Sequence, residues 1–117
     1  AHAYEATLGF SKKLNHGEAV ILGIQSALRF SLKRKKFKKK EYESIINHIN
    51  QAGLPSKVSK YFSIKNLNKI IYFMMKDKKN YSSKINLILL RNIGSPEIDN
   101  QFSINAIKTF MKNELKN

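Results

Sequence analysis

Two histidines near the start of the chain are the residues best suited to chemistry. His2 and His16 flank a polar loop, and His16 stands at the predicted start of a helix, within His16-Gly17-Glu18. The positive end of a helix dipole disfavours the imidazolium form and leaves a neutral ring, which can bind a metal or accept a hydrogen bond. A histidine at this place is also commonly a polar cap, and two histidines without a nearby set of carboxylates do not specify zinc. Both interpretations stay open on the residues alone.

A lysine pair is the second candidate. Lys78 and Lys79 follow Asp77, between an apolar segment and a predicted turn at 77–84. Two ammonium groups at such a place can hold a phosphate or a carboxylate, whereas in a lysine-rich chain the same pair also fits a solvated turn. His48, in the middle of a predicted helix, is expected at the surface or partly packed.

Composition limits what else the chain can do. It has 117 residues, 13.5 kDa, a formal net charge of +14 and no cysteine. Disulfides, thiolate metal sites and cysteine nucleophiles are therefore excluded, and any metal must use His, Asp or Glu. The length predicts a single domain over 1–117. No apolar stretch approaches the ~18 residues of a membrane span, and the start lacks the order of a signal peptide, so we expect a soluble cytoplasmic protein with no membrane partner.

The positive charge suggests nucleic-acid binding, which is the alternative from a different functional class. Only three of the 22 basic residues are arginine (Arg29, Arg34 and Arg91), although arginine dominates base recognition. The basic run KRKKFKKK at 33–40 contains one aromatic residue and little stacking surface, so it is interpreted as a solvated helix junction. No specific nucleic-acid partner is predicted.

Apolar spacing predicts the elements that must position these residues. Apolar residues recur every three or four positions, which predicts helices over 2–8, 16–34, 41–52, 64–76 and 104–115. Gly53 and Pro55 are expected to end the third helix, and Ser63 and Ser103 to cap the last two. The stretch 85–90 is predicted to be a strand paired with residues around 97–99. The fold class is mainly α, a helical bundle of four to five helices with a minor β-hairpin.

Packing predictions follow from the same spacing. Small residues four apart in the second helix (Ala19, Gly23 and Ala27) permit the close approach of another backbone, and Ile24 is assigned to the same buried face. Met74 and Met75 are expected to fill the core. The first helix begins without a cap, so residue 1 is interpreted as a cut end.

Five segments, in order, resemble the C-terminal domain of the 3-dehydroquinate synthase family. They are HAYEA (2–6), LNHGEAVILGI (14–24), QAGLP (51–55), MMKDKKN (74–80) and INLILLRNIG (85–94). The resemblance covers almost the whole chain. It favours dehydroquinate synthase over a related sugar-phosphate cyclase or a metal-dependent polyol dehydrogenase, which remain alternatives within the enzyme class.

The resemblance implies a phosphate-eliminating lyase of the shikimate pathway, the route to aromatic amino acids. It converts 3-deoxy-D-arabino-heptulosonate 7-phosphate to 3-dehydroquinate and phosphate, using NAD and zinc or cobalt. It further implies a metal ligand at His16, a catalytic and substrate-phosphate contact at His2, substrate binding at Lys78 or Lys79, and a homodimeric parent enzyme.

The family pattern also has parts that this sequence lacks. Where the family has Gly-His-x-x-Gly-His, Ala1 precedes His2, and the first histidine of that element lies outside the sequence. The nucleotide-binding domain is outside it as well, and no residue here is assigned to NAD. We therefore expect a C-terminal fragment that is inactive alone and binds neither zinc nor NAD well, because one ligand of three does not hold catalytic zinc.

Overall fold

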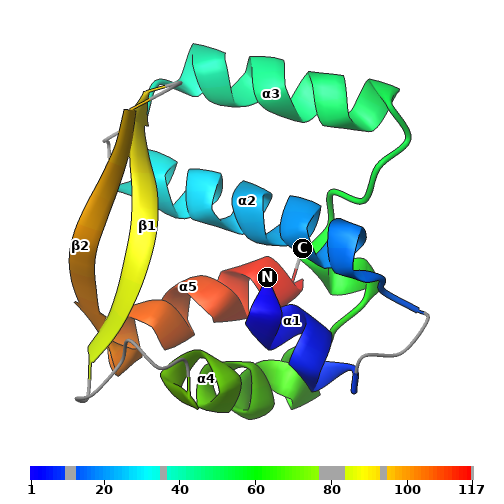
Figure 1. The fold of residues 1–117 in the computed structure, drawn as a ribbon, viewed down its shortest axis with the longest axis vertical. Helices are drawn as coiled ribbons and strands as arrows, with labels where there is room; N and C mark the ends of the chain where they lie inside the picture. The colour runs from blue at the N-terminus through cyan, green and yellow to red at the C-terminus, as the bar shows by residue number, and fades with distance from the viewer. Residues whose placement is uncertain (10–12, 35–36, 77–83, 93–94, 117) are drawn as a thin grey trace.

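The protein is built around one long central helix. The computed structural model describes residues 1–9, 13–34, 37–76, 84–92 and 95–116. Its elements, in chain order, are α1 (His2–Thr7), α2 (His16–Lys33), α3 (Lys39–Gln51), two short 3₁₀ turns η1 (Val58–Lys60) and η2 (Ile64–Asn66), α4 (Leu67–Lys76), β1 (Lys84–Asn92), β2 (Ser95–Ser103) and α5 (Ile104–Lys116). Helix α2 packs against α1, α3 and the hairpin, and α4 packs against α1 and α5 (Figure 1). The predicted class, a helical bundle with a minor hairpin, is confirmed.

The helix ends follow the local sequence closely. Asn15 caps α2 through a capping box, in which its side chain accepts from the Glu18 amide while Glu18 accepts from the Asn15 amide. Gly53 follows α3 with φ of +73°, and Leu54 N–H donates to the Ile49 carbonyl, a glycine-dependent helix stop. Ser63 and Ser103 accept hydrogen bonds from amides of the following turns, as predicted.

Two helix starts differ from the predictions. Helix α3 begins at Lys39, two residues before the predicted start, because lysine has a favourable helix propensity. The segment predicted as one helix over 64–76 opens as the 3₁₀ turn η2 before α4 begins at Leu67.

The predicted hairpin is present. Strands β1 and β2 pair antiparallel, with Leu89 opposite Glu97 and Ile85 opposite Phe102, and the register shifts at two places. In Figure 1 the hairpin runs along one side of the molecule, past the ends of α3, α2 and α5. The predicted turn lies outside the described residues, apart from residue 84, which opens β1.

The buried face of α2 differs from the predicted stripe. Ala19 is buried as expected, but Ile24 is 47% exposed, and Leu22 and Gln25 take interior positions instead. The difference arises because α2 is contacted by α1, α3 and the hairpin, so a single apolar stripe does not describe its interior side. Similarly, Met74 packs against the core, but Met75 is exposed, so its assignment to the core was wrong.

The close approach predicted at the small residues of α2 is confirmed at Gly23. A Cβ atom placed there would lie 2.7 Å from the backbone nitrogen of Ala1, so the start of α1 rests directly on α2.

Among the described residues, no helix is long and apolar enough to cross a membrane.

Candidate metal and substrate site

His16 is an exposed candidate that has a defined partner. Its Nδ1 atom lies 2.9 Å from Oε1 of Glu5, which joins the first residue of α2 to α1. The His16 side chain is 78% exposed, whereas that of Glu5 is only 14% exposed. The carboxylate is therefore set back between the helices, and the imidazole projects from it toward solvent.

The chemistry of this contact depends on which ring nitrogen carries the proton. An ionised carboxylate only accepts hydrogen bonds, so the contact with Glu5 is a hydrogen bond when Nδ1 of His16 is protonated. In the neutral ring, Nε2 is then an acceptor with a free lone pair. A metal ion requires that same lone pair.

The capping interpretation of His16 does not hold. The residue that caps α2 is Asn15, and His16 occupies the first turn of the helix with its ring turned to Glu5. The sequence analysis did not identify Glu5 as the partner of His16. The sequence feature that could have indicated it is the position of Glu5 within HAYEA, three residues after His2.

His2 opens α1 and is exposed. Side chains three residues apart leave the same face of a helix, so His2 and Glu5 share one face of α1. His2 is the first residue of α1 and His16 is the first residue of α2. The contact between Glu5 and His16 joins these two helices. His48 is exposed on α3, as predicted.

The described residues do not complete a metal site. None of them form a group of three or more His, Asp or Glu that could hold a metal ion. Lys78 and Lys79, the predicted substrate ligands, lie outside the described residues.

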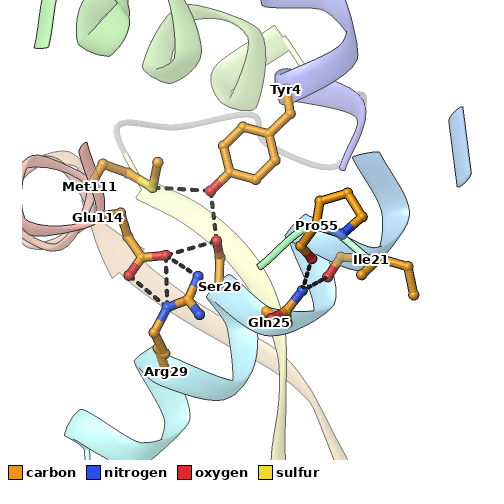
Figure 2. A network of polar contacts seen from close by, with 8 residues as sticks. All are labelled: Tyr4, Ile21, Gln25, Ser26, Arg29, Pro55, Met111 and Glu114. Atoms are coloured by element: carbon orange, nitrogen blue, oxygen red, sulfur yellow. Dashed lines mark hydrogen bonds and ion pairs between the residues drawn. The ribbon is translucent and has the colours of Figure 1, made fainter. Parts of the chain in front are cut away.

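A buried polar network fixes α1 to α2 and α5, and sequence reasoning missed it (Figure 2). The Tyr4 hydroxyl lies 2.7 Å from Ser26 Oγ, and Ser26 donates to Glu114 Oε1 at 3.0 Å. Arg29 donates to both Glu114 oxygens, with its shortest contact 2.7 Å from Nη2 to Oε1. The network connects α1, α2 and α5, and its member Tyr4 directly precedes Glu5 in α1.

Burial perturbs two members of this network. Burial raises the pKa of Tyr4 well above its ordinary value of about 10, and the hydrogen bond with Ser26 offsets only part of that rise. For Arg29, burial lowers the pKa, but the hydrogen bonds and charge of Glu114, with a contribution from Tyr42, outweigh it and raise the pKa overall. Tyr4 therefore stays neutral and Arg29 stays charged at ordinary pH.

The QAGLP segment has a structural role in addition to ending α3. The Gln25 side chain, fully buried in α2, donates to the Pro55 carbonyl at 2.7 Å and to the Ile21 carbonyl at 3.2 Å (Figure 2). This bond ties the loop after α3 to the centre of α2.

The basic run is partly committed to packing. Phe37 is 4% exposed, so the run's one aromatic ring is not available for base stacking. Lys33 lies over the ring of Phe110, and Arg34 lies over that of Phe102. Among the described residues of the run, Phe37 therefore packs in the core and Lys33 and Arg34 lie over core rings, whereas Lys38, Lys39 and Lys40 are exposed, as the interpretation of a solvated helix junction expects.

Fold and site together define a helical domain whose described residues present a histidine–carboxylate pair but no complete metal site. The family profile described as 3-dehydroquinate synthase C-terminal matches residues 1–80. The chain belongs to the 3-dehydroquinate synthase family and corresponds to its C-terminal part.

Curated relatives agree with this assignment. The chain is 58% identical over 115 residues to the 3-dehydroquinate synthase of Pelagibacter ubique, covering 98% of this chain and 31% of the relative. It is 33% identical over 114 residues to that of Zymomonas mobilis, covering 97% of this chain and 30% of the relative. With that of Thermoanaerobacter pseudethanolicus it shares 34% identity over 99 residues, 83% of this chain and 26% of the relative. The chain thus spans about a third or less of these relatives, whose shared name does not favour the cyclase, dehydrogenase or nucleic-acid alternatives.

Proposed function

We propose that this chain supplies the C-terminal part of a 3-dehydroquinate synthase active site. The reaction is the lyase step that converts 3-deoxy-D-arabino-heptulosonate 7-phosphate to 3-dehydroquinate and phosphate. The observation that carries the proposal is the His16–Glu5 pair, which lies inside the matched region and leaves Nε2 exposed as an acceptor. The shared name of the relatives supports the choice of reaction.

His16 is the residue of this chain that holds the metal in the proposal. An exposed neutral imidazole with a free Nε2 fits zinc or cobalt, which imidazole nitrogen binds well. Catalytic zinc takes three protein ligands, so the remaining ligands, and the NAD site, belong to parts of a longer enzyme. A zinc ion bound there would act as a Lewis acid toward a substrate hydroxyl group, and NAD would supply the redox chemistry.

The other candidate residues handle the charged substrate. We assign His2 as a catalytic residue that contacts the substrate phosphate, because the family resemblance implies this role for the histidine at its position. Lys78 and Lys79 are assigned to the phosphate or carboxylate of the substrate, where an ammonium group forms charge-assisted hydrogen bonds. The net charge of +14 attracts such an anionic substrate over a longer range.

The proposal includes the setting implied by the family resemblance: a homodimeric cytoplasmic enzyme with a sugar-phosphate substrate and neither a membrane nor a sequence-specific nucleic-acid partner. The 117-residue chain by itself is expected to be inactive. Calorimetric titration of the chain with zinc should show no stoichiometric submicromolar site. A tight site that disappears in His16→Ala would contradict this part of the proposal.

The experiment that tests the function is a domain exchange. Residues 1–117 replace the corresponding region of the Pelagibacter ubique relative, and phosphate release and 3-dehydroquinate formation are followed with the sugar-phosphate substrate. We expect an active chimaera whose activity and bound zinc are both lost in His16→Ala. His48→Ala is the matched control, because His48 is exposed on α3, outside the proposed site. A folded chimaera without activity, or one that keeps its zinc after His16→Ala, would refute the proposal.

A further inference from the structure

We propose that Glu5 is a positioning residue that holds His16 in the Nδ1–H tautomer and aims Nε2 at the metal. This inference rests on the proposed function of His16 as a metal ligand. The contact of 2.9 Å between Glu5 Oε1 and His16 Nδ1 is its geometric basis. A metal-binding imidazole commonly donates its second N–H to a carboxylate, which fixes the tautomer and makes the binding nitrogen more basic.

The two partners differ in burial in the way that this role requires. The Glu5 side chain is 14% exposed and that of His16 is 78% exposed, so the carboxylate lies behind the ring and the ring faces outward. An exposed surface pair has two mobile side chains and little effect on stability. Here one partner is held by its surroundings, so the orientation of the other is restricted.

The backbone that carries Glu5 is fixed by its neighbours on α1. Tyr4 is 4% exposed, and its hydroxyl joins the buried network that ends on Glu114 and Arg29. Thr7 donates to the Ala3 carbonyl at 2.7 Å, and the start of α1 lies against Gly23 of α2. Helix α1 is only six residues long, so its position depends on the tertiary contacts of Tyr4 and of the helix start, and these contacts hold Glu5 beside the first turn of α2.

The backbone that carries His16 is fixed independently. The capping box between Asn15 and Glu18 holds the first turn of α2, and Leu14, just before it, is 1% exposed. Glu18 is the other carboxylate of this turn, but its Oε1 accepts from the Asn15 amide. This difference makes Glu18 a matched control for Glu5.

The tautomer of His16 provides a readout that does not depend on activity. The 117-residue chain is labelled with ¹⁵N in its histidines, and the ring nitrogens are observed by long-range ¹H–¹⁵N correlation at about pH 8, above the ordinary imidazole pKa of about 6.5. We expect the Nδ1–H form for His16 in the unmodified chain and in Glu18→Gln. In Glu5→Ala we expect a shift toward the Nε2–H form that free histidine favours in water. An Nε2–H ring in the unmodified chain would overturn the inference whatever the variants do, as would a ring that is unchanged in Glu5→Ala.

Zinc affinity in the chimaera separates a positioning residue from a ligand. Glu5→Ala is expected to weaken zinc binding by about 10- to 100-fold, the range seen when a partner of a metal-binding histidine is removed. His16→Ala should weaken it much more, and Glu18→Gln should leave it within about twofold. Equal losses in Glu5→Ala and His16→Ala would make Glu5 a ligand and overturn the inference, and so would an unchanged affinity in Glu5→Ala. If His16→Ala keeps its zinc, the proposed function fails instead, while the tautomer measurement still decides the pairing.

Discussion

Replacing Glu114 by alanine is expected to destabilise the fold severely, because this carboxylate accepts the hydrogen bonds of both Ser26 and Arg29 in the buried network. It is 9% exposed and accepts three hydrogen-bond contacts from Arg29 and one from Ser26. Removing it takes the only carboxylate described beside the Arg29 guanidinium, whose side chain is only 22% exposed. Deleting one member of a buried ion pair costs about 3–5 kcal/mol. The remaining solvent exposure of Arg29 places the expected loss near the lower end, at about 3 kcal/mol.

A loss of this size is large for a domain of 117 residues. Native domains are stable by about 5–15 kcal/mol, so the variant retains a fraction of its stability and unfolds at a clearly lower urea concentration. The chain has no tryptophan, so unfolding is best followed by far-ultraviolet circular dichroism. The change in the free energy of unfolding is the shift of the urea midpoint multiplied by the slope m, which is taken as equal for both proteins.

Two further variants test the cause of the loss. Glu43→Ala removes an exposed carboxylate of α3 and should change the free energy of unfolding by no more than about 0.5 kcal/mol. The double variant Arg29→Met/Glu114→Leu removes both charges and should recover at least half of the loss, since apolar replacement of a buried pair is often neutral. A loss below about 1 kcal/mol in Glu114→Ala, or no recovery in the double variant, would refute the reasoning.

Three other predictions concern the same packing and the surface charge. The pKa of Tyr4 is raised in the folded state. Above about pH 10 the unfolded chain therefore loses the Tyr4 proton while the folded chain keeps it, so the free energy of unfolding falls as the pH rises. Compared with Tyr4→Phe, the unmodified chain should lose about 1.4 kcal/mol more per pH unit in urea titrations well above pH 10, and parallel curves would contradict this. Gly23→Ala should destabilise the fold by about 1–3 kcal/mol, because the added Cβ collides with the Ala1 backbone. Gly17→Ala should be neutral or stabilising by up to about 1 kcal/mol, because its Cβ meets Asn15 Oδ1 at an ordinary 3.6 Å. Equal thermal midpoints for the two variants would contradict the packing argument. DNA retention in a mobility assay should be weak, insensitive to sequence and lost with added salt, and tight binding to one sequence would revive the nucleic-acid alternative.

Local features of the fold were predictable because they depend on short-range chemistry. The five helices, the caps at Ser63 and Ser103, the stop at Gly53 and the pairing near Glu97 all follow from spacing and from turn or cap residues. Burial was less predictable. Ile24 and Met75 have apolar side chains at helical spacing, yet both are exposed, because neighbouring elements determine which side of a helix is covered.

The sequence by itself determined the helical class, the order of elements and the candidate histidines, since these depend on residue type and local spacing. Only the tertiary structure decided which polar groups meet. Glu5 and His16 are 11 residues apart on different helices, and Arg29 and Glu114 are 85 apart. Periodicity describes one helix at a time, whereas these pairs depend on the angle and depth at which helices pack. For that reason the motif indicates His16 as a ligand, whereas its pairing with Glu5 depends on how α1 lies against α2.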